Sequence, residues 1–361
     1  MSTLIQNPPF ADAFGLVEKA LKTVDSIRAK AKEKGHLGIR RKSIACENHF
    51  NDACVRLQRL RDQLTCVGAV MASDVKYQTY SEYLQYASKS LTSEMNEFVE
   101  YIKGKKKDYS RQQLCHYTSL FHHLAEEIKY LFPGGAFSLN QTFGKNSVQM
   151  WWNENFNSRV VVGRDDFSVR ILKAFPVLRE NIEAFMDSLC FSSPKYVSKY
   201  DLDIFTRLFW PWSHLVQVWT SLVGHPGYQK NGTFNTTIEA LNEHRMTPGS
   251  YVFRISMSCN GYWSIGYVAS DGKIVQVLCF GLPMIDYLYY GKQQGLYKFP
   301  NGKDWEDDLS AVSNLKTRVT VCEYDNDNTD SITCKICGVD LNDIQLEPCG
   351  HFVCKQCCKK M

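Results

Sequence analysis

The chain has 361 residues, of which 44% are hydrophobic and 22% charged, a composition typical of a globular protein with room for two or three domains. Its formal net charge of +4 is small and its basic clusters are short, so no nucleic-acid partner is expected. No apolar run reaches the about 18 residues of a membrane span, and the N-terminus lacks a secretory signal, which predicts a cytoplasmic protein without a transmembrane segment.

Residues 1–141 are predicted to form a four-helix bundle. Apolar residues recur at steps of three and four in the stretches 17–31, 50–64, 77–102 and 114–131. Each such stripe buries one face of a helix, and four of them can share one core. The pair His122 and His123 falls in the last stretch and is interpreted as surface and packing residues, not as ligands.

Residues 142–217 remain helical and fit two helix–loop–helix units. The segment 190–201 has the length of a calcium-binding EF-hand loop. Such a loop needs several oxygen ligands, and one carboxylate alone does not hold calcium, so tight calcium binding is not expected. The positions of this degenerate calcium loop are Cys190, Ser192, Pro194, Tyr196 and Asp201.

Residues 218–309 are predicted to form an SH2-like domain. Short strands are expected over 247–256, 262–270 and 273–278, with a turn at Asp271-Gly272 between the last two. Helical stretches precede the first strand and follow the third. A helix, central antiparallel strands and a second helix are the plan of an SH2 domain, so the fold class is multidomain, mainly α and then α+β.

Arg254 lies inside the first of these strands, between apolar neighbours. Alternation places Val252, Arg254 and Ser256 on one face of the strand. One interpretation is an arginine on the solvated face of an edge strand. The other is a phosphate receptor, because a guanidinium binds two phosphate oxygens at once, and the following loop, with Ser258 and Gly261, offers a hydroxyl and backbone N–H groups.

Fourteen cysteines in a reducing compartment are not expected to form disulfides. Six of them crowd into the last 28 residues, which predicts a metal site. Two C-x2-C pairs at this separation supply the four thiolates of a closed tetrahedral zinc site. Its predicted ligands are Cys334, Cys337, Cys354 and Cys357.

The order of several motifs resembles the Cbl family of RING-type E3 ubiquitin ligases over nearly the whole chain. The motifs are DIFTRLFWPWSHL, HPGY, PGSYVFRIS, YWSIGYV, DGKI, CKIC and EPCGH. The resemblance implies a phosphotyrosine-binding unit made of a four-helix bundle, an EF-hand and an SH2 domain. It also implies phosphotyrosine-containing tyrosine kinases and adaptors as partners, and recruitment to activated receptors at the plasma membrane.

The resemblance assigns roles to residues of the phosphate site. Arg254 takes the place of the phosphotyrosine-binding arginine, and Ser256 that of the neighbouring hydroxyl. Gly261 takes the place of a glycine whose loss impairs binding in the family. Cys259 stands where the family often has a second basic residue.

The resemblance identifies residues 334–361 as an incomplete RING finger. Cys349 and His351 would begin a second zinc site, whose last ligand pair has no counterpart before Met361. A RING docks a ubiquitin-charged E2 enzyme and acts by positioning. Ile336 matches one E2-docking position of the family, and Met361 occupies the position of another.

Residues 310–333 are expected to link the SH2-like domain to the zinc module. Tyr324 matches a regulatory tyrosine of the family linker, and Asp327 stands near the place of a second. Three functions remain open. The first is an E3 ligase adaptor, the second a non-catalytic phosphotyrosine adaptor that competes with such ligases, and the third a helical scaffold in which Arg254 is structural.

Overall fold

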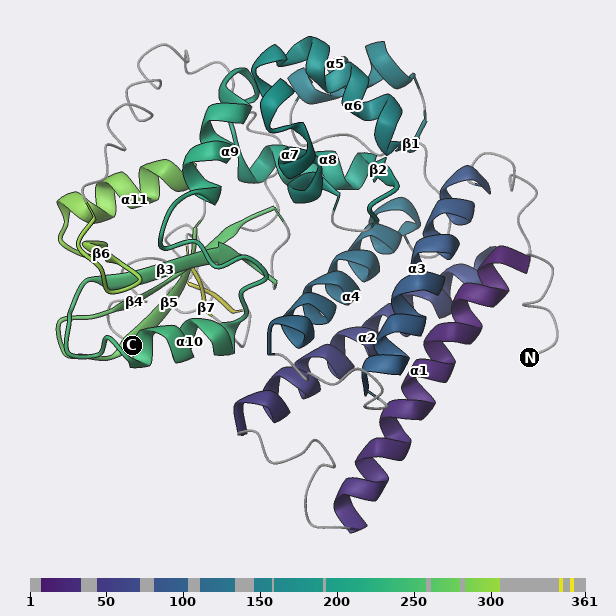
Figure 1. Ribbon diagram of the computed structural model, residues 1–361, viewed down its shortest axis with the longest axis horizontal. Helices are drawn as coiled ribbons and strands as arrows, with labels where there is room; N and C mark the ends of the chain where they lie inside the picture. Colours follow the sequence, from purple (N-terminus) through teal and green to yellow (C-terminus); the bar gives the residue numbers. More distant parts are fainter. Residues whose placement is uncertain are drawn as a thin grey trace. The chain divides into compact units, whose positions relative to one another are not determined.

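The computed structural model describes two compact units, which comprise residues 1–203 and 204–361 (Figure 1). Within them, the described residues are 8–33, 44–71, 81–102, 111–133, 146–157, 159–190, 193–257, 261–279, 283–305, 344–346 and 351–353. Among these residues, no helix is both long enough and apolar enough to cross a membrane.

The predicted bundle is confirmed as the main part of the first unit. Its helices are α1 (Pro8–Glu33), α2 (Ile44–Met71), α3 (Ser81–Ile102) and α4 (Arg111–Leu131). Helix α2 packs on α4 and α1 packs on α3. In the core, the Phe98 ring meets Tyr117 and Phe121 edge-on at centroid distances of 4.9 and 5.1 Å. These residues belong to the apolar stripes of the sequence, which explains why the stripes predicted the bundle.

Two helix–loop–helix units follow the bundle along the chain, and the last helix ends beyond the boundary at residue 203. The first consists of α5 (Asn146–Phe156), β1 (Val161–Gly163) and α6 (Arg164–Ala174). After the short η3 (Pro176–Glu180), the second consists of α7 (Ile182–Leu189), β2 (Tyr196–Ser198) and α8 (Lys199–Leu208). Strands β1 and β2 pair antiparallel, with Val162 opposite Val197. This pairing of two loops makes the region an EF-hand-like pair.

The second unit contains a four-stranded sheet in the order β5-β4-β3-β6. Its central strands are β3 (Ser250–Ile255), β4 (Trp263–Val268) and β5 (Ile274–Cys279), antiparallel as predicted. The short β6 (Phe299–Pro300), which the sequence pattern did not indicate, pairs parallel with β3. Strand β3 is therefore an interior strand.

Helices cover both faces of this sheet. The elements before β3 are η4 (Trp212–His214), α9 (Leu215–Val223) and α10 (Phe234–Asn242), and α11 (Met284–Gln293) follows β5. Helix α10 buries Leu241 against Val252 and Val268. Figure 1 shows α10 and α11 on opposite sides of the sheet, the arrangement expected for an SH2-like domain.

A capping box starts helix α10. The Thr236 N–H donates to the Thr233 hydroxyl over 3.2 Å, and the Thr233 N–H donates to the Thr236 hydroxyl over 2.8 Å. These reciprocal bonds satisfy two backbone donors that would otherwise have no partner in the first turn. The cap therefore fixes the beginning of the helix that faces Arg254.

Near the C-terminus, β7 (Ile344–Leu346) and β8 (His351–Val353) form an antiparallel pair. Most of the predicted RING finger lies outside the described residues. The same holds for the linker with Tyr324 and Asp327, for the E2-docking positions Ile336 and Met361, and for the zinc ligands Cys334, Cys337, Cys349, Cys354 and Cys357. The backbone of His351 begins β8.

Candidate functional site

Arg254 lies in the middle of β3 and is 1% exposed, one of the largest fully buried side chains among the described residues. Its Nε donates to the Thr237 hydroxyl of α10 over 3.2 Å, and one terminal nitrogen donates to Gln276 Oε1 of β5 over 3.2 Å. The guanidinium thus points to the α10 face of the sheet, which it shares with Val252 as alternation predicted. The alternative of an edge-strand arginine on a solvated face is wrong.

The two side chains that accept from Arg254 are themselves held by neighbours. The Thr237 hydroxyl donates to Gln229 Oε1 over 3.1 Å. Gln276 Nε2 donates to the Phe234 carbonyl at the start of α10 over 3.1 Å. Because each acceptor has a second bond, the guanidinium is held in one orientation before any ligand binds, which lowers the entropic cost of binding.

Two glycines allow the backbone to approach this cluster closely. A Cβ on Gly232 would lie 3.0 Å from Arg254 Cβ and 3.1 Å from its Cδ. A Cβ on Gly266 of β4 would lie 2.2 Å from Thr237 Cγ2, closer than two carbons can approach. Any side chain at Gly266 therefore presses on the residue that orients the Arg254 guanidinium.

The loop after β3 is closed by Ser256 and Gly261. The buried Ser256 donates its backbone N–H to the Tyr262 carbonyl over 2.9 Å. Gly261 has a φ of +78°, and a Cβ there would lie 2.8 Å from Arg207 Cδ. Both the left-handed backbone and this contact explain a glycine at that position. Ser258 and Cys259 lie outside the described residues.

The phosphate roles of Arg254, Ser256, Ser258 and Gly261 stay predictions, although the structure places the described ones around one loop and one strand. Sequence reasoning missed Thr237, Gln276 and Gly266. These three residues come from three different elements. The only sequence signal for them was the pair of small residues Ser264 and Gly266, two positions apart in YWSIGYV, which indicated that a helix packs closely on that face.

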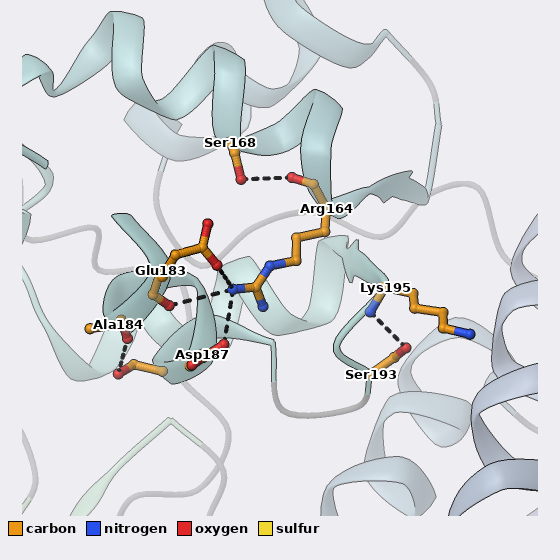
Figure 2. A network of polar contacts seen from close by, with 8 residues as sticks. Arg164, Ser168, Glu183, Ala184, Asp187, Ser193 and Lys195 are labelled. Atoms are coloured by element: carbon orange, nitrogen blue, oxygen red, sulfur yellow. Dashed lines mark hydrogen bonds and ion pairs between the residues drawn. The ribbon is translucent and has the colours of Figure 1, made fainter. Parts of the chain in front are cut away.

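An arginine of α6 binds α7, the helix that precedes the degenerate calcium loop (Figure 2). Arg164, the first residue of α6, donates through one terminal nitrogen to Glu183 Oε2 at 2.8 Å and to Asp187 Oδ1 at 2.9 Å. Its side chain is 14% exposed, and both carboxylates belong to α7. An internal cation thus links the two helix–loop–helix units.

Asp201, at the last position of the loop, has protein partners at both carboxylate oxygens. Its Oδ1 lies 2.7 Å from His123 Nε2, and its Oδ2 accepts the Ser198 N–H at 3.1 Å. Asp201 is 0% exposed. His123 is buried as well, so its interpretation as a surface or packing residue missed this contact.

The other described loop positions add no side-chain oxygen ligand for calcium. Burial, reinforced by the charge of Asp201, raises the pKa of the Cys190 thiol to about 12, and a neutral thiol is no ligand for calcium. Pro194 has no side-chain oxygen, the position of Tyr196 contributes only a backbone carbonyl in such loops, and Ser192 lies outside the described residues. The described residues therefore do not fit a calcium ion.

Comparison with known proteins agrees with this architecture. Residues 142–223 match the family model of the EF hand-like domain of the CBL proto-oncogene N-terminus, and residues 224–309 match the model of its SH2-like domain. Together with the bundle, these domains define a protein with a Cbl-type N-terminal unit.

The chain belongs to the Cbl family. It is 35% identical to the E3 ubiquitin-protein ligase CBL-C of Rattus norvegicus over 257 residues, and 34% identical to that of Homo sapiens over 258 residues. Each match covers 68% of this chain but only 52% and 54% of the two relatives. The solved structure of an inactive choanoflagellate E3 ubiquitin ligase Cbl TKB is similar with a TM-score of 0.69 and 25% identity, over 87% of this chain and 97% of that one.

Proposed function

We propose that this chain is a phosphotyrosine-recognising adaptor of Cbl type, which presents activated tyrosine kinases and their adaptors for ubiquitination and so down-regulates their signalling. The observation that carries the proposal is the buried and oriented guanidinium of Arg254 in an SH2-like domain. The names of the two relatives, both E3 ubiquitin-protein ligases, support the ligase part.

The site recognises phosphate through a guanidinium that Thr237 and Gln276 orient. In the structure, the guanidinium donates to neutral oxygens of Thr237 and Gln276. A phosphate carries a charge of about −1.5 to −2 at neutral pH. Its oxygens form shorter and stronger bonds with a guanidinium than neutral oxygens do. A phosphate oxygen within reach of Arg254 therefore gains a charge-assisted hydrogen bond, and this bond drives binding.

Ubiquitin transfer is assigned to the C-terminal zinc module. Four thiolates, Cys334, Cys337, Cys354 and Cys357, would hold zinc in a tetrahedral site, with Cys349 and His351 in a second one. Bound zinc would stabilise this short segment, and the folded module would dock an E2 enzyme. The alternative of a non-catalytic competitor rests only on the missing ligand pair before Met361, and the ligase names of the relatives disfavour it.

The phosphotyrosine part is tested by calorimetric titration of the 361-residue protein with N-acetyl phosphotyrosine amide and with a phosphotyrosine peptide library. We expect binding of the phosphorylated ligands and none of their unphosphorylated counterparts. Arg254→Lys retains the charge but loses the planar fork, and should weaken binding by about tenfold or more. Equal affinity for phosphorylated and unphosphorylated ligands would refute phosphotyrosine recognition.

The ligase part needs a separate assay. The protein is mixed with zinc and a ubiquitin-charged E2, and discharge of the thioester is followed over time. Accelerated discharge supports the ligase. A folded protein that binds phosphotyrosine without accelerating discharge would be the non-catalytic competitor.

A further inference from the structure

Ser264 is a buried hydroxyl next to the arginine site. It lies on β4 directly opposite Arg254 in the antiparallel pair of β3 and β4. Directly opposite residues point to the same face of a sheet, with Cβ atoms about 4.5–5.5 Å apart. Ser264 therefore points, like Arg254, to the face covered by α10.

The Ser264 hydroxyl has no hydrogen-bond partner among the described residues, although the side chain is 1% exposed. Burial of an unpaired hydroxyl costs free energy, so such groups are rare and often meet a ligand or a water molecule. Ser250 on β3 lies on the same face and shows the ordinary case. It is 0% exposed, and its hydroxyl donates to the Thr247 carbonyl over 2.7 Å.

The loop after β3 lacks basic residues, so a phosphate bound at Arg254 depends more on neutral hydrogen-bond donors. The stretch from Ser256 to Gly261 contains no lysine or arginine. A phosphate bound at Arg254 therefore gains no second cation from this stretch. The remaining phosphate oxygens need neutral donors, and the Ser264 hydroxyl, on the same face of the sheet as Arg254, is such a donor.

We propose that Ser264 is a phosphate-contacting residue, whose hydroxyl donates to a phosphotyrosine oxygen while Arg254 binds the others. This inference rests on the proposed phosphotyrosine recognition and adds a specificity determinant to it. In the free protein the hydroxyl lacks a partner, and ligand binding supplies one. Removal of the hydroxyl thus weakens the bound state without removing any hydrogen bond that the structure shows in the free state.

The test compares Ser264→Ala with Ser250→Ala in the full 361-residue protein. Affinity for N-acetyl phosphotyrosine amide and for a phosphotyrosine peptide is measured by calorimetry, and stability by thermal unfolding. We expect Ser264→Ala to bind both ligands about tenfold more weakly, equivalent to about 1.4 kcal/mol, at unchanged or higher thermal stability. The matched control Ser250→Ala should lose stability, because it breaks a bond, and keep its affinity within about twofold.

The outcomes separate this inference from the proposed function. If Ser264→Ala stays within about twofold of the wild type while Arg254→Lys loses binding, the hydroxyl is satisfied by water and the inference is overturned. If neither variant changes the affinity, phosphotyrosine recognition through Arg254 fails as well. Ser264→Cys preserves the size of the side chain with a weaker donor, and should fall between wild type and Ser264→Ala.

Discussion

Gly266→Ala should perturb the arginine site through packing alone. The added Cβ would lie 2.2 Å from Thr237 Cγ2, whereas carbon atoms in contact are about 3.5–4.0 Å apart, so one of them must move by roughly 1.5 Å. The Thr237 side chain cannot rotate out of the way, because it is β-branched and its hydroxyl is hydrogen-bonded to both Gln229 and Arg254.

The expected cost follows from these two constraints. Overpacking of a core by one methyl group typically costs about 1–3 kcal/mol. Displacement of Thr237 also lengthens its bond with Arg254, a bond to a charged group that contributes about 1.5–3 kcal/mol. We therefore expect Gly266→Ala to lower the free energy of unfolding by about 2–3 kcal/mol, because the overpacking cost and the loss of the Thr237–Arg254 hydrogen bond are each only partly incurred. Phosphotyrosine binding should weaken at least about tenfold, since the guanidinium loses its orientation.

Urea unfolding and calorimetric titration measure both effects. Gly15→Ala is the matched control, because it makes the same chemical change in α1, where a Cβ would meet nothing within 4 Å. It should stabilise its own unit by about 0.5–1 kcal/mol, since alanine is the better helix former. Unchanged stability and unchanged affinity of Gly266→Ala would refute the view that Thr237 is a rigid support of the site.

Three further predictions concern the EF-hand-like pair. Arg164→Ala should lower the free energy of unfolding of the first unit by only about 1–2 kcal/mol, because its two carboxylate partners are largely exposed and such pairs are weak. Millimolar calcium should leave the wild-type urea transition unchanged, and a shift would contradict the expectation that the degenerate loop does not bind calcium tightly. Cys190 should resist iodoacetamide at pH 8, where a pKa of about 12 leaves about one thiolate in ten thousand. Peptide mapping should find the exposed Cys66 alkylated before Cys190, and equal rates for the two in the folded protein would refute this prediction.

Local patterns were sufficient to predict the bundle helices, the three central strands of the sheet and the face of Arg254. The alternation in YVFRIS places Val252 and Arg254 together, and the structure buries Val252 against Leu241 of α10 on that side. The apolar stripes of the bundle were informative for the same reason, since burial of a continuous face imposes a period on the sequence.

The partners of Arg254 and Asp201 were beyond prediction from one sequence. Thr237 and Gln276 meet Arg254 from positions 17 and 22 residues away, and His123 meets Asp201 across 78 residues. Such contacts follow from how helices and strands pack, and no local period records them. Residue type alone also misled at His123, because a histidine pair on an amphipathic helix fits solvent as well as a buried acceptor.

The guanidinium of Arg164 gives the EF-hand-like pair a thermodynamic property that a metal-loaded pair lacks. A bound ion stabilises a fold by an amount that depends on its free concentration and vanishes when the ion is removed. Arg164 is covalently part of the chain, so its bonds to Glu183 and Asp187 have no concentration term. A chelator has nothing to withdraw from the bridge between α6 and α7, and a rise in calcium has nothing to add to it.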